Sequence, residues 1–174
     1  MDLRLASALA ALLVASTGLA LAQQMTTDIN RISSAGLGEK IGTVVISEGK
    51  GGTSFKVSVK GLPAAQRGFH VHEKGDCGPG MKDGKMEAGI AAGGHYDPEG
   101  HESHKGPKGK GHKGDLPLLK GSASGIEQTV TAPRLKLADI KGRSIVIHEG
   151  GDNYSDTPEN GGGKGRVACG VIPK

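Results

Sequence analysis

The sequence predicts an all-β protein, an antiparallel sandwich or barrel built from eight short strands. Apolar and polar residues alternate in several short stretches, which is the pattern of strands that bury one face. The chain holds 31 glycines and 8 prolines, and these turn residues separate the alternating stretches. Short strands divided by turns at this spacing are typical of sandwiches and barrels. We find neither an internal repeat nor a second domain.

The expected strands follow one another along the chain. The first is expected over residues 28–37, and a segment rich in Gly, Pro and Lys, GGHYDPEGHESHKGPKGKGHKGDLP, is expected to form a long loop before the fifth strand. The remaining strands are expected at residues 40–47, 53–60, 68–73, 116–121, 125–131, 143–148 and 166–172.

The first 22 residues resemble a secretory signal peptide. An apolar run over residues 5–21 ends in Ala20-Leu21-Ala22, a small-residue cleavage motif, although Asp2 offsets Arg4 in the basic region before it. The run is short for a full membrane span, so an anchor is the weaker interpretation. Cleavage would leave residues 23–174 as one domain.

The basic excess does not predict binding to nucleic acid. The net charge is +4, and much of it comes from lysines that are spaced by glycine and interleaved with histidine, without aromatic residues for stacking. We expect a solvated loop face that attracts small anions, and no membrane contact once the signal is removed. These lysines are Lys105, Lys108, Lys110 and Lys113.

Histidines in three separate segments are candidate metal ligands. In GFHVHEKGDC, His70 and His72 stand at i and i+2, so a strand would place both imidazoles on one face. Such a pair forms half of a metal site. On its own, it also fits a polar strand face exposed to water.

The glycine-rich loop carries a second set of ligands. His95, His104, His112 and Asp115 offer three nitrogens and one oxygen, a set that suits four-coordinate zinc. A bound ion would order a loop that cannot bury enough apolar surface by itself. His101 lies in the same loop, and the residues alone leave it an equal candidate.

The third segment, RSIVIHEGGDNYSD, places His148 at the end of an expected strand. Ser144 and Val146 would share its face. A site that joins His148 to His70, His72 and His95 would be rich in nitrogen, which favours copper. If His95 serves both ions, it must bridge them through both ring nitrogens.

Five motifs in order, GFHVHEKGDC, GGHYDP, GPKGKGHKGDLP, VIHEGGDNYSD and GRVACGVI, resemble the bacterial periplasmic copper/zinc superoxide dismutases. The resemblance runs from about residue 42 to residue 172. It implies an eight-stranded antiparallel Greek-key β-barrel, similar to an immunoglobulin sandwich, with long metal-binding and active-site loops. It also implies the conversion of superoxide to dioxygen and hydrogen peroxide by Cu(II)/Cu(I) cycling.

The resemblance assigns a role to each matching residue. Asp152 matches the carboxylate that hydrogen-bonds one copper ligand and one zinc ligand, and Arg166 matches the active-site arginine beside copper. His95 is the bridging ligand that takes part in proton transfer, and His101 becomes a solvated loop histidine. One copper per subunit would be held by His70, His72, His95 and His148, and one zinc by His95, His104, His112 and Asp115.

Only two cysteines occur, Cys77 and Cys169, and a disulfide between them would join the loop after His72 to the strand that carries Arg166. The alternative, two free thiols as metal ligands, is less favoured because the histidine set is already complete. A disulfide requires an oxidising compartment, and with the signal peptide this predicts the periplasm. Superoxide is the expected partner, and the family also allows a homodimer.

Three other functions fit part of the pattern. A secreted copper or zinc storage protein would use the same ligands, but it would not need Arg166, Asp152 or the disulfide. A copper-only relative would not need His104, His112 and Asp115. A purely structural or adhesive β-domain would not explain seven ligands in register.

Overall fold

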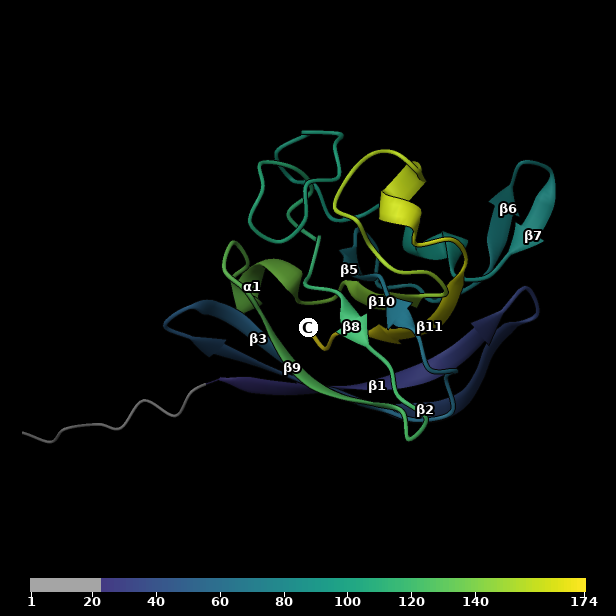
Figure 1. Cartoon of the computed structure of the whole chain (residues 1–174), viewed down its shortest axis with the longest axis horizontal. Coiled ribbons are helices and arrows are strands. Elements are labelled where there is room, and N and C mark those ends of the chain that lie inside the picture. The colour runs from purple at the N-terminus through teal and green to yellow at the C-terminus, as the bar shows by residue number, and fades with distance from the viewer. Residues whose placement is uncertain (1–22) are drawn as a thin grey trace, which may run out of the picture.

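Seven strands form one curled antiparallel sheet in the computed structural model, which describes residues 23–174 (Figure 1). The expected signal peptide, residues 1–22, lies outside the described residues. From edge to edge the order is β5-β10-β11-β1-β2-β3-β9. The strands are β1 (Gln24–Ser33), β2 (Gly36–Gly49), β3 (Gly52–Val59), β5 (Phe69–His72), β9 (Ile126–Ala132), β10 (Ser144–His148) and β11 (Arg166–Val171).

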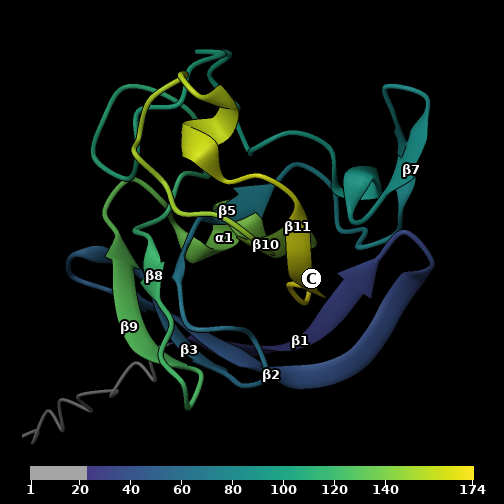
Figure 2. The ribbon, with the colours of Figure 1, turned by 45° about the vertical axis from the view of Figure 1, so that its right-hand side comes forward.

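A short strand pair brings the two edges of the sheet together. Strand β4 (Gln66–Arg67) pairs with β8 (Leu119–Lys120). Because β4 leads directly into edge strand β5, and β8 leads into edge strand β9, this pair joins the edges and closes the curl. Figure 2 shows the resulting barrel, with the long loops gathered at one end. The predicted barrel class is confirmed.

The structure corrects two predicted strands and adds elements that periodicity did not indicate. The strand expected at 28–37 is wrong at its end, because a turn follows Ser33 and Gly36, at φ +115°, already begins β2. The strand expected at 116–121 shrinks to Leu119–Lys120. The additional elements are β6 (Gly80–Lys82), β7 (Lys85–Glu87), α1 (Leu137–Ile140), η1 (Ile90–Ala92) and η2 (Glu159–Gly162).

The core lies inside the curl. As the alternation predicted, Ile145 and Ile147 of β10 belong to the main apolar cluster, whereas Val146 points outward into a second cluster with the cysteines. The two phenylalanines, Phe55 and Phe69, meet edge to face with their ring centroids 5.9 Å apart. Full burial of a side chain of this size contributes about 1.5–3 kcal/mol to folding. The barrel is therefore a packed scaffold for the loops.

Strands β5 and β10 are buried on both faces. Every residue of Phe69–His72 and of Ser144–His148 is buried. One face of these two strands packs against the core, and the loops cover the other face.

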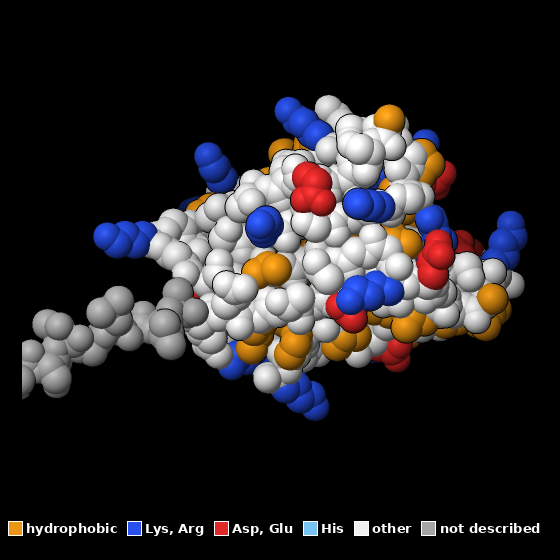
Figure 3. Space-filling view, turned by 90° about the horizontal axis from the view of Figure 1, so that it is seen from below, with side chains coloured by type: hydrophobic (Ala, Val, Ile, Leu, Met, Phe, Trp, Pro, Cys, Tyr) orange, Lys and Arg blue, Asp and Glu red, His pale blue; other side chains and the backbone are white. Residues whose placement is uncertain are grey.

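Figure 3, a view from the side of β1 and β2, shows apolar side chains scattered between charged ones. Within residues 23–174, the structure has no helix of the length and apolarity needed to cross a bilayer.

Candidate metal centre and active-site cleft

Strands β5 and β10 bring three of the predicted ligands together. The two strands pair antiparallel, with His70 opposite Val146 and His72 opposite Ser144. His148 ends β10 on the same outer face, and a β-bridge from His72 places His95 beside them. The ring centroids of His70 and His95 are 3.9 Å apart, and those of His70 and His148 are 4.7 Å apart. One nitrogen from each of the four rings lies within 4.8 Å of the others.

Several nitrogens of this histidine set are buried without a hydrogen-bond partner. They are Nδ1 of His70, Nε2 of His72 and both ring nitrogens of His148. The other nitrogens of the first two rings are held in place, since His70 Nε2 pairs with Asp152 and His72 Nδ1 lies 3.0 Å from the Gly93 carbonyl. Buried polar atoms are nearly always paired. A nitrogen-coordinated ion such as copper would supply the missing partner.

The protonation of these rings favours metal binding. Burial, helped by repulsion from neighbouring His95, lowers the pKa of His70 and His72 well below the usual value. The same two effects, with Arg166 nearby, lower the pKa of His148 to about 3. The rings are therefore neutral near pH 7, and a metal ion need not compete with protons for them.

The loop ligands converge on Asp115. Its Oδ1 atom lies 3.1 Å from His95 Nδ1, 3.0 Å from His104 Nδ1 and 3.4 Å from His112 Nδ1. Zinc bonds of about 2.0–2.1 Å in a tetrahedron place the ligand atoms about 3.3 Å apart. The Nδ1 atoms of His104 and His112 are close to the carboxylate yet make no hydrogen bond. Both observations fit four atoms arranged around a common ion.

His70 is also close to this second set. A ligand atom of His70 lies within 4.8 Å of those of His95, His104 and Asp115. However, its Nε2 is already paired with Asp152. The Nδ1 of His112 is also buried and unpaired, and it lies 3.4 Å from Asp115, so His112 fits as a fourth ligand as well.

Opposite pKa shifts of His104 and Asp115 fit a cation site in the second set. Burial alone would lower the pKa of His104, but contacts with the carboxylates of Asp115 and Asp152 outweigh it and raise the pKa to about 9. Burial would raise the pKa of Asp115, yet the three imidazoles hold it far below its usual range. Without metal, a proton on His104 therefore compensates the buried charge, and a metal ion would replace that proton.

Asp152 links the two sets. Its Oδ2 lies 2.9 Å from His70 Nε2, and its Oδ1 lies 2.7 Å from His104 Nε2. Gly161 passes so close that a Cβ there would lie 2.2 Å from Asp152 Oδ1, and its φ of +67° also favours glycine. The carboxylate therefore fixes one ring of each set. The backbone at Gly161 lies against the carboxylate and holds it in position.

Sequence reasoning missed the residues that hold the loops. Arg134 donates hydrogen bonds to the carbonyls of Gly106, Pro107, Gly111 and His112, so one side chain holds the loop that carries His104 and His112. At the end of β10, the buried Arg67 donates to the carbonyls of His148 and Glu149, both at 3.2 Å. Neither arginine stands in a motif, and no local pattern identifies either of them.

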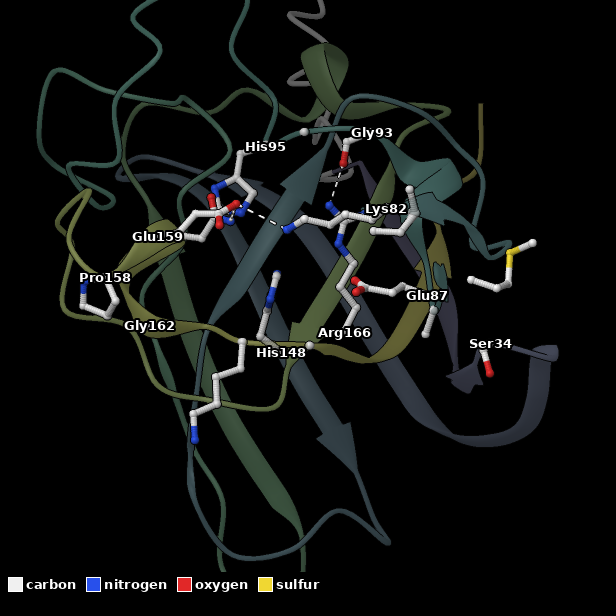
Figure 4. A pocket seen from close by; sticks show the side chains of 17 residues that line it. Ser34, Lys82, Glu87, Gly93, His95, His148, Pro158, Glu159, Gly162 and Arg166 are labelled. Carbon is white, nitrogen blue, oxygen red and sulfur yellow. Dashed lines mark hydrogen bonds and ion pairs between the residues drawn. The ribbon is translucent and has the colours of Figure 1, made fainter. Parts of the chain in front are cut away.

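Arg166 lies in an open cleft of about 1100 Å³ beside His95 and His148 (Figure 4). Its guanidinium donates to the carbonyls of Gly89 and Gly93, the latter at 2.8 Å. Burial lowers its pKa somewhat, but a guanidinium remains charged at any physiological pH. The cleft therefore presents a fixed cation next to the four-histidine set.

The predicted disulfide is confirmed. Cys77 and Cys169 are bonded, with their Cα atoms 5.7 Å apart, and the bond ties the segment after β5 to β11. It lies only three residues from Arg166, so it anchors the strand that carries the guanidinium. His101, by contrast, lies outside both metal sets, 3.6 Å from Asp97 and from Glu99.

Comparison with known proteins identifies the family. The model of the copper/zinc superoxide dismutase family matches residues 40–172. The chain is 53% identical to the superoxide dismutase [Cu-Zn] of Brucella abortus over 156 residues, covering 88% of this chain and 90% of that one. It is 45% identical to the corresponding protein of Escherichia coli over 172 residues, covering 97% and 98%.

Solved structures give the same result. The Cu/Zn superoxide dismutase from Brucella abortus superposes with a TM-score of 0.84 at 53% identity, covering 86% of this chain and 99% of that one. The monomeric copper, zinc superoxide dismutase from Salmonella enterica gives a TM-score of 0.77 at 48% identity, covering 86% and 99%. With its closed barrel, its two ligand sets and its disulfide, this chain belongs to the copper/zinc superoxide dismutase family.

Proposed function

We propose that the two ligand sets hold one copper and one zinc, the cofactors of this family of superoxide dismutases. The observation that carries the assignment is the convergence of buried, unpaired nitrogens on two neighbouring points. His95 belongs to both sets. Its Nδ1 faces Asp115, so its Nε2 is available to the other set. Copper is assigned to His70, His72, His95 and His148, and zinc to His95, His104, His112 and Asp115.

The reaction consumes two superoxide ions and two protons and yields dioxygen and hydrogen peroxide. Bound copper supplies the redox chemistry, accepting an electron from one superoxide and giving it to the next. The chain supplies the geometry and one of the protons. We assign that proton to Nε2 of His95, the ring nitrogen on the side of the copper set, which would hold it and donate it to the departing peroxide.

Arg166 docks the substrate in this proposal. Its guanidinium lines the same cleft as His95 and His148, and two carbonyls fix its orientation. A fixed donor beside the metal set binds a small anion without the cost of reorganisation. Lys164, at the same cleft, adds positive charge that attracts the anion.

The sequence supports a periplasmic site of action. Residues 1–22 are proposed as a cleaved secretory signal and residues 23–174 as the mature domain, where oxidation of the cysteines requires an oxidising compartment. N-terminal sequencing of the secreted protein would identify the cleavage site.

A homodimer is the assembly proposed from the family resemblance, whereas the Salmonella enterica relative is described as monomeric. Sedimentation of the mature protein measures which form this chain takes.

The decisive experiment measures copper and zinc per chain together with superoxide consumption in the same sample. We expect about one of each metal and rapid consumption. Both metals without consumption would move the assignment to storage. The Asp115→Ala variant should lose zinc first, whereas Asp28→Ala, on the exposed far side of β1, should keep both metals. Zinc retained at one per chain in Asp115→Ala would show that the zinc set is misassigned.

A further inference from the structure

A methionine pair stands on a hairpin beside the cleft. Strands β6 and β7 are joined by a turn at Asp83 and Gly84, and Met81 lies directly opposite Met86. Figures 1 and 2 both show this hairpin projecting from the barrel. Side chains directly opposite each other in an antiparallel pair lie on one face, with Cβ atoms about 4.5–5.5 Å apart. The two flexible thioethers are therefore within reach of a single ion.

Packing does not account for these methionines. Met81 is 62% exposed and Met86 is 50% exposed, although methionine usually fills gaps in a core. The third methionine of residues 23–174, Met25, follows that usual pattern and packs against the barrel core. The paired methionines stay largely in water and contribute little to the apolar core.

The position of the hairpin connects the pair to the copper set. Met86 lines the same cleft as His95, His148 and Arg166. The four histidines assigned to copper are 0–6% exposed, and this cleft opens onto two of them. An ion in this cleft is therefore exposed to Met86 as well as to two of the imidazoles.

The thioether is a soft ligand that selects Cu(I) over zinc. We propose that Met81 and Met86 form a docking site for Cu(I), from which the ion passes to His70, His72, His95 and His148. The onward step rests on the copper set proposed above, whereas binding to the pair does not. Two neutral thioethers hold the ion less tightly than the larger set of buried imidazoles, so transfer runs inward. Zinc, which prefers nitrogen, oxygen and thiolate ligands, bypasses the pair.

Binding is tested first, on the protein fully loaded with copper and zinc, so that the histidine sites are already occupied. The methionine methyl groups are labelled with ¹³C, and Ag(I) is added as a redox-stable substitute for Cu(I). The methyl resonances of Met81 and Met86 should shift together and saturate at one ion per chain, while that of Met25 stays in place. If the pair does not shift, or shifts no more than Met25, the docking site does not exist.

Loading is tested with Met81→Leu/Met86→Leu, because leucine keeps the apolar area and removes the sulfur. With the zinc-loaded, copper-free protein and a soluble Cu(I) complex as donor, we expect copper uptake to slow at least fivefold. Final copper content and turnover should be unchanged, and Met25→Leu should load like the wild type. Uptake by the double leucine variant at the wild-type rate overturns the proposal. A second variant, Met81→Ser/Met86→Ser, also removes the apolar area. If uptake is slow only in this serine variant, the apolar area and not the sulfur is responsible, and the proposal is overturned as well. A wrong copper set would show differently, as missing copper in the wild type at equilibrium.

Discussion

Oδ1 of Asp152 accepts a hydrogen bond from Nε2 of His104 at 2.7 Å, and the other oxygen of the same carboxylate holds a histidine of the copper set. One buried side chain therefore fixes a ring on each side of the shared His95. In the proposed assignment, the two metal sites are coupled through Asp152 as well as through His95.

Replacing the linking carboxylate should weaken the binding of both metals. In Asp152→Asn the amide keeps the shape but loses the charge and one acceptor. Loss of such an outer partner reduces metal affinity by about 10–100-fold. Competition with a chelator measures the change, and Asp28→Asn is the surface control. Unchanged affinity for zinc and copper would mean that packing alone orients the two rings.

Arg166 should contribute to turnover and not to metal retention. Arg166→Glu replaces the docking cation with an anion, and kcat/KM should fall by about 10²-fold or more, as when a preorganised donor is lost. Arg166→Lys keeps the charge but cannot reproduce both bonds to Gly89 and Gly93, so its activity should be intermediate. Copper content should stay at the wild-type level in both variants. Loss of copper with the charge reversal would refute the assigned role.

The disulfide should contribute substantially to stability. It closes a loop of 92 residues, for which the chain-entropy model gives about 4–5 kcal/mol, with strain or residual structure reducing that figure. Cys77→Ser/Cys169→Ser should lower the melting temperature in calorimetry. A reductant should destabilise the wild type and leave the double variant unaffected. Equal melting temperatures for the two proteins would contradict this estimate.

The metal-free protein should be most stable near pH 6.5. His104 has a folded pKa of about 9, above its unfolded value, so its contribution is complete below pH 6.5 and is lost as pH rises toward 9. His70, His72 and His148 have lowered pKa values, so their protonation in the unfolded state destabilises the fold below pH 6.5. Urea unfolding at several pH values gives the profile. In the zinc-loaded protein the decline in stability above pH 6.5 should disappear, since zinc replaces the proton on His104. If the zinc-loaded protein still loses stability above pH 6.5, His104 is not the source of that loss.

The strands and the ligand groups could be predicted because they depend on local pattern. Alternation placed His70 and His72 on one face of β5 and placed Ile145 and Ile147 in the core, and the structure agrees. The turn after Ser33 was missed although Ser33, Ser34 and Gly36 are residue types that favour turns, and Ile32 pairs with Leu37 across the hairpin.

The contacts that hold the loops could not be predicted because they join residues distant in sequence through backbone atoms. Arg134 binds carbonyls 22–28 residues away, and any residue type can supply a carbonyl. Likewise, Asp156 accepts a hydrogen bond from the backbone N–H of His104 at 2.6 Å, a contact that no side-chain motif specifies. Only the folded loop shows which charged side chains lie within hydrogen-bonding distance of these backbone groups.

Gly161 leaves no room for a side chain beside Asp152. In a scan of all single substitutions, this position should therefore be as intolerant as one in the barrel core, although it lies in a loop of mostly polar residues. The first defect of even a small replacement such as Gly161→Ala should be displacement of the carboxylate from His104, ahead of any loss of the barrel. A variant of this kind would fold and accumulate as a protein deficient in metal. A screen that reports only expression level would therefore miss the defect in metal binding.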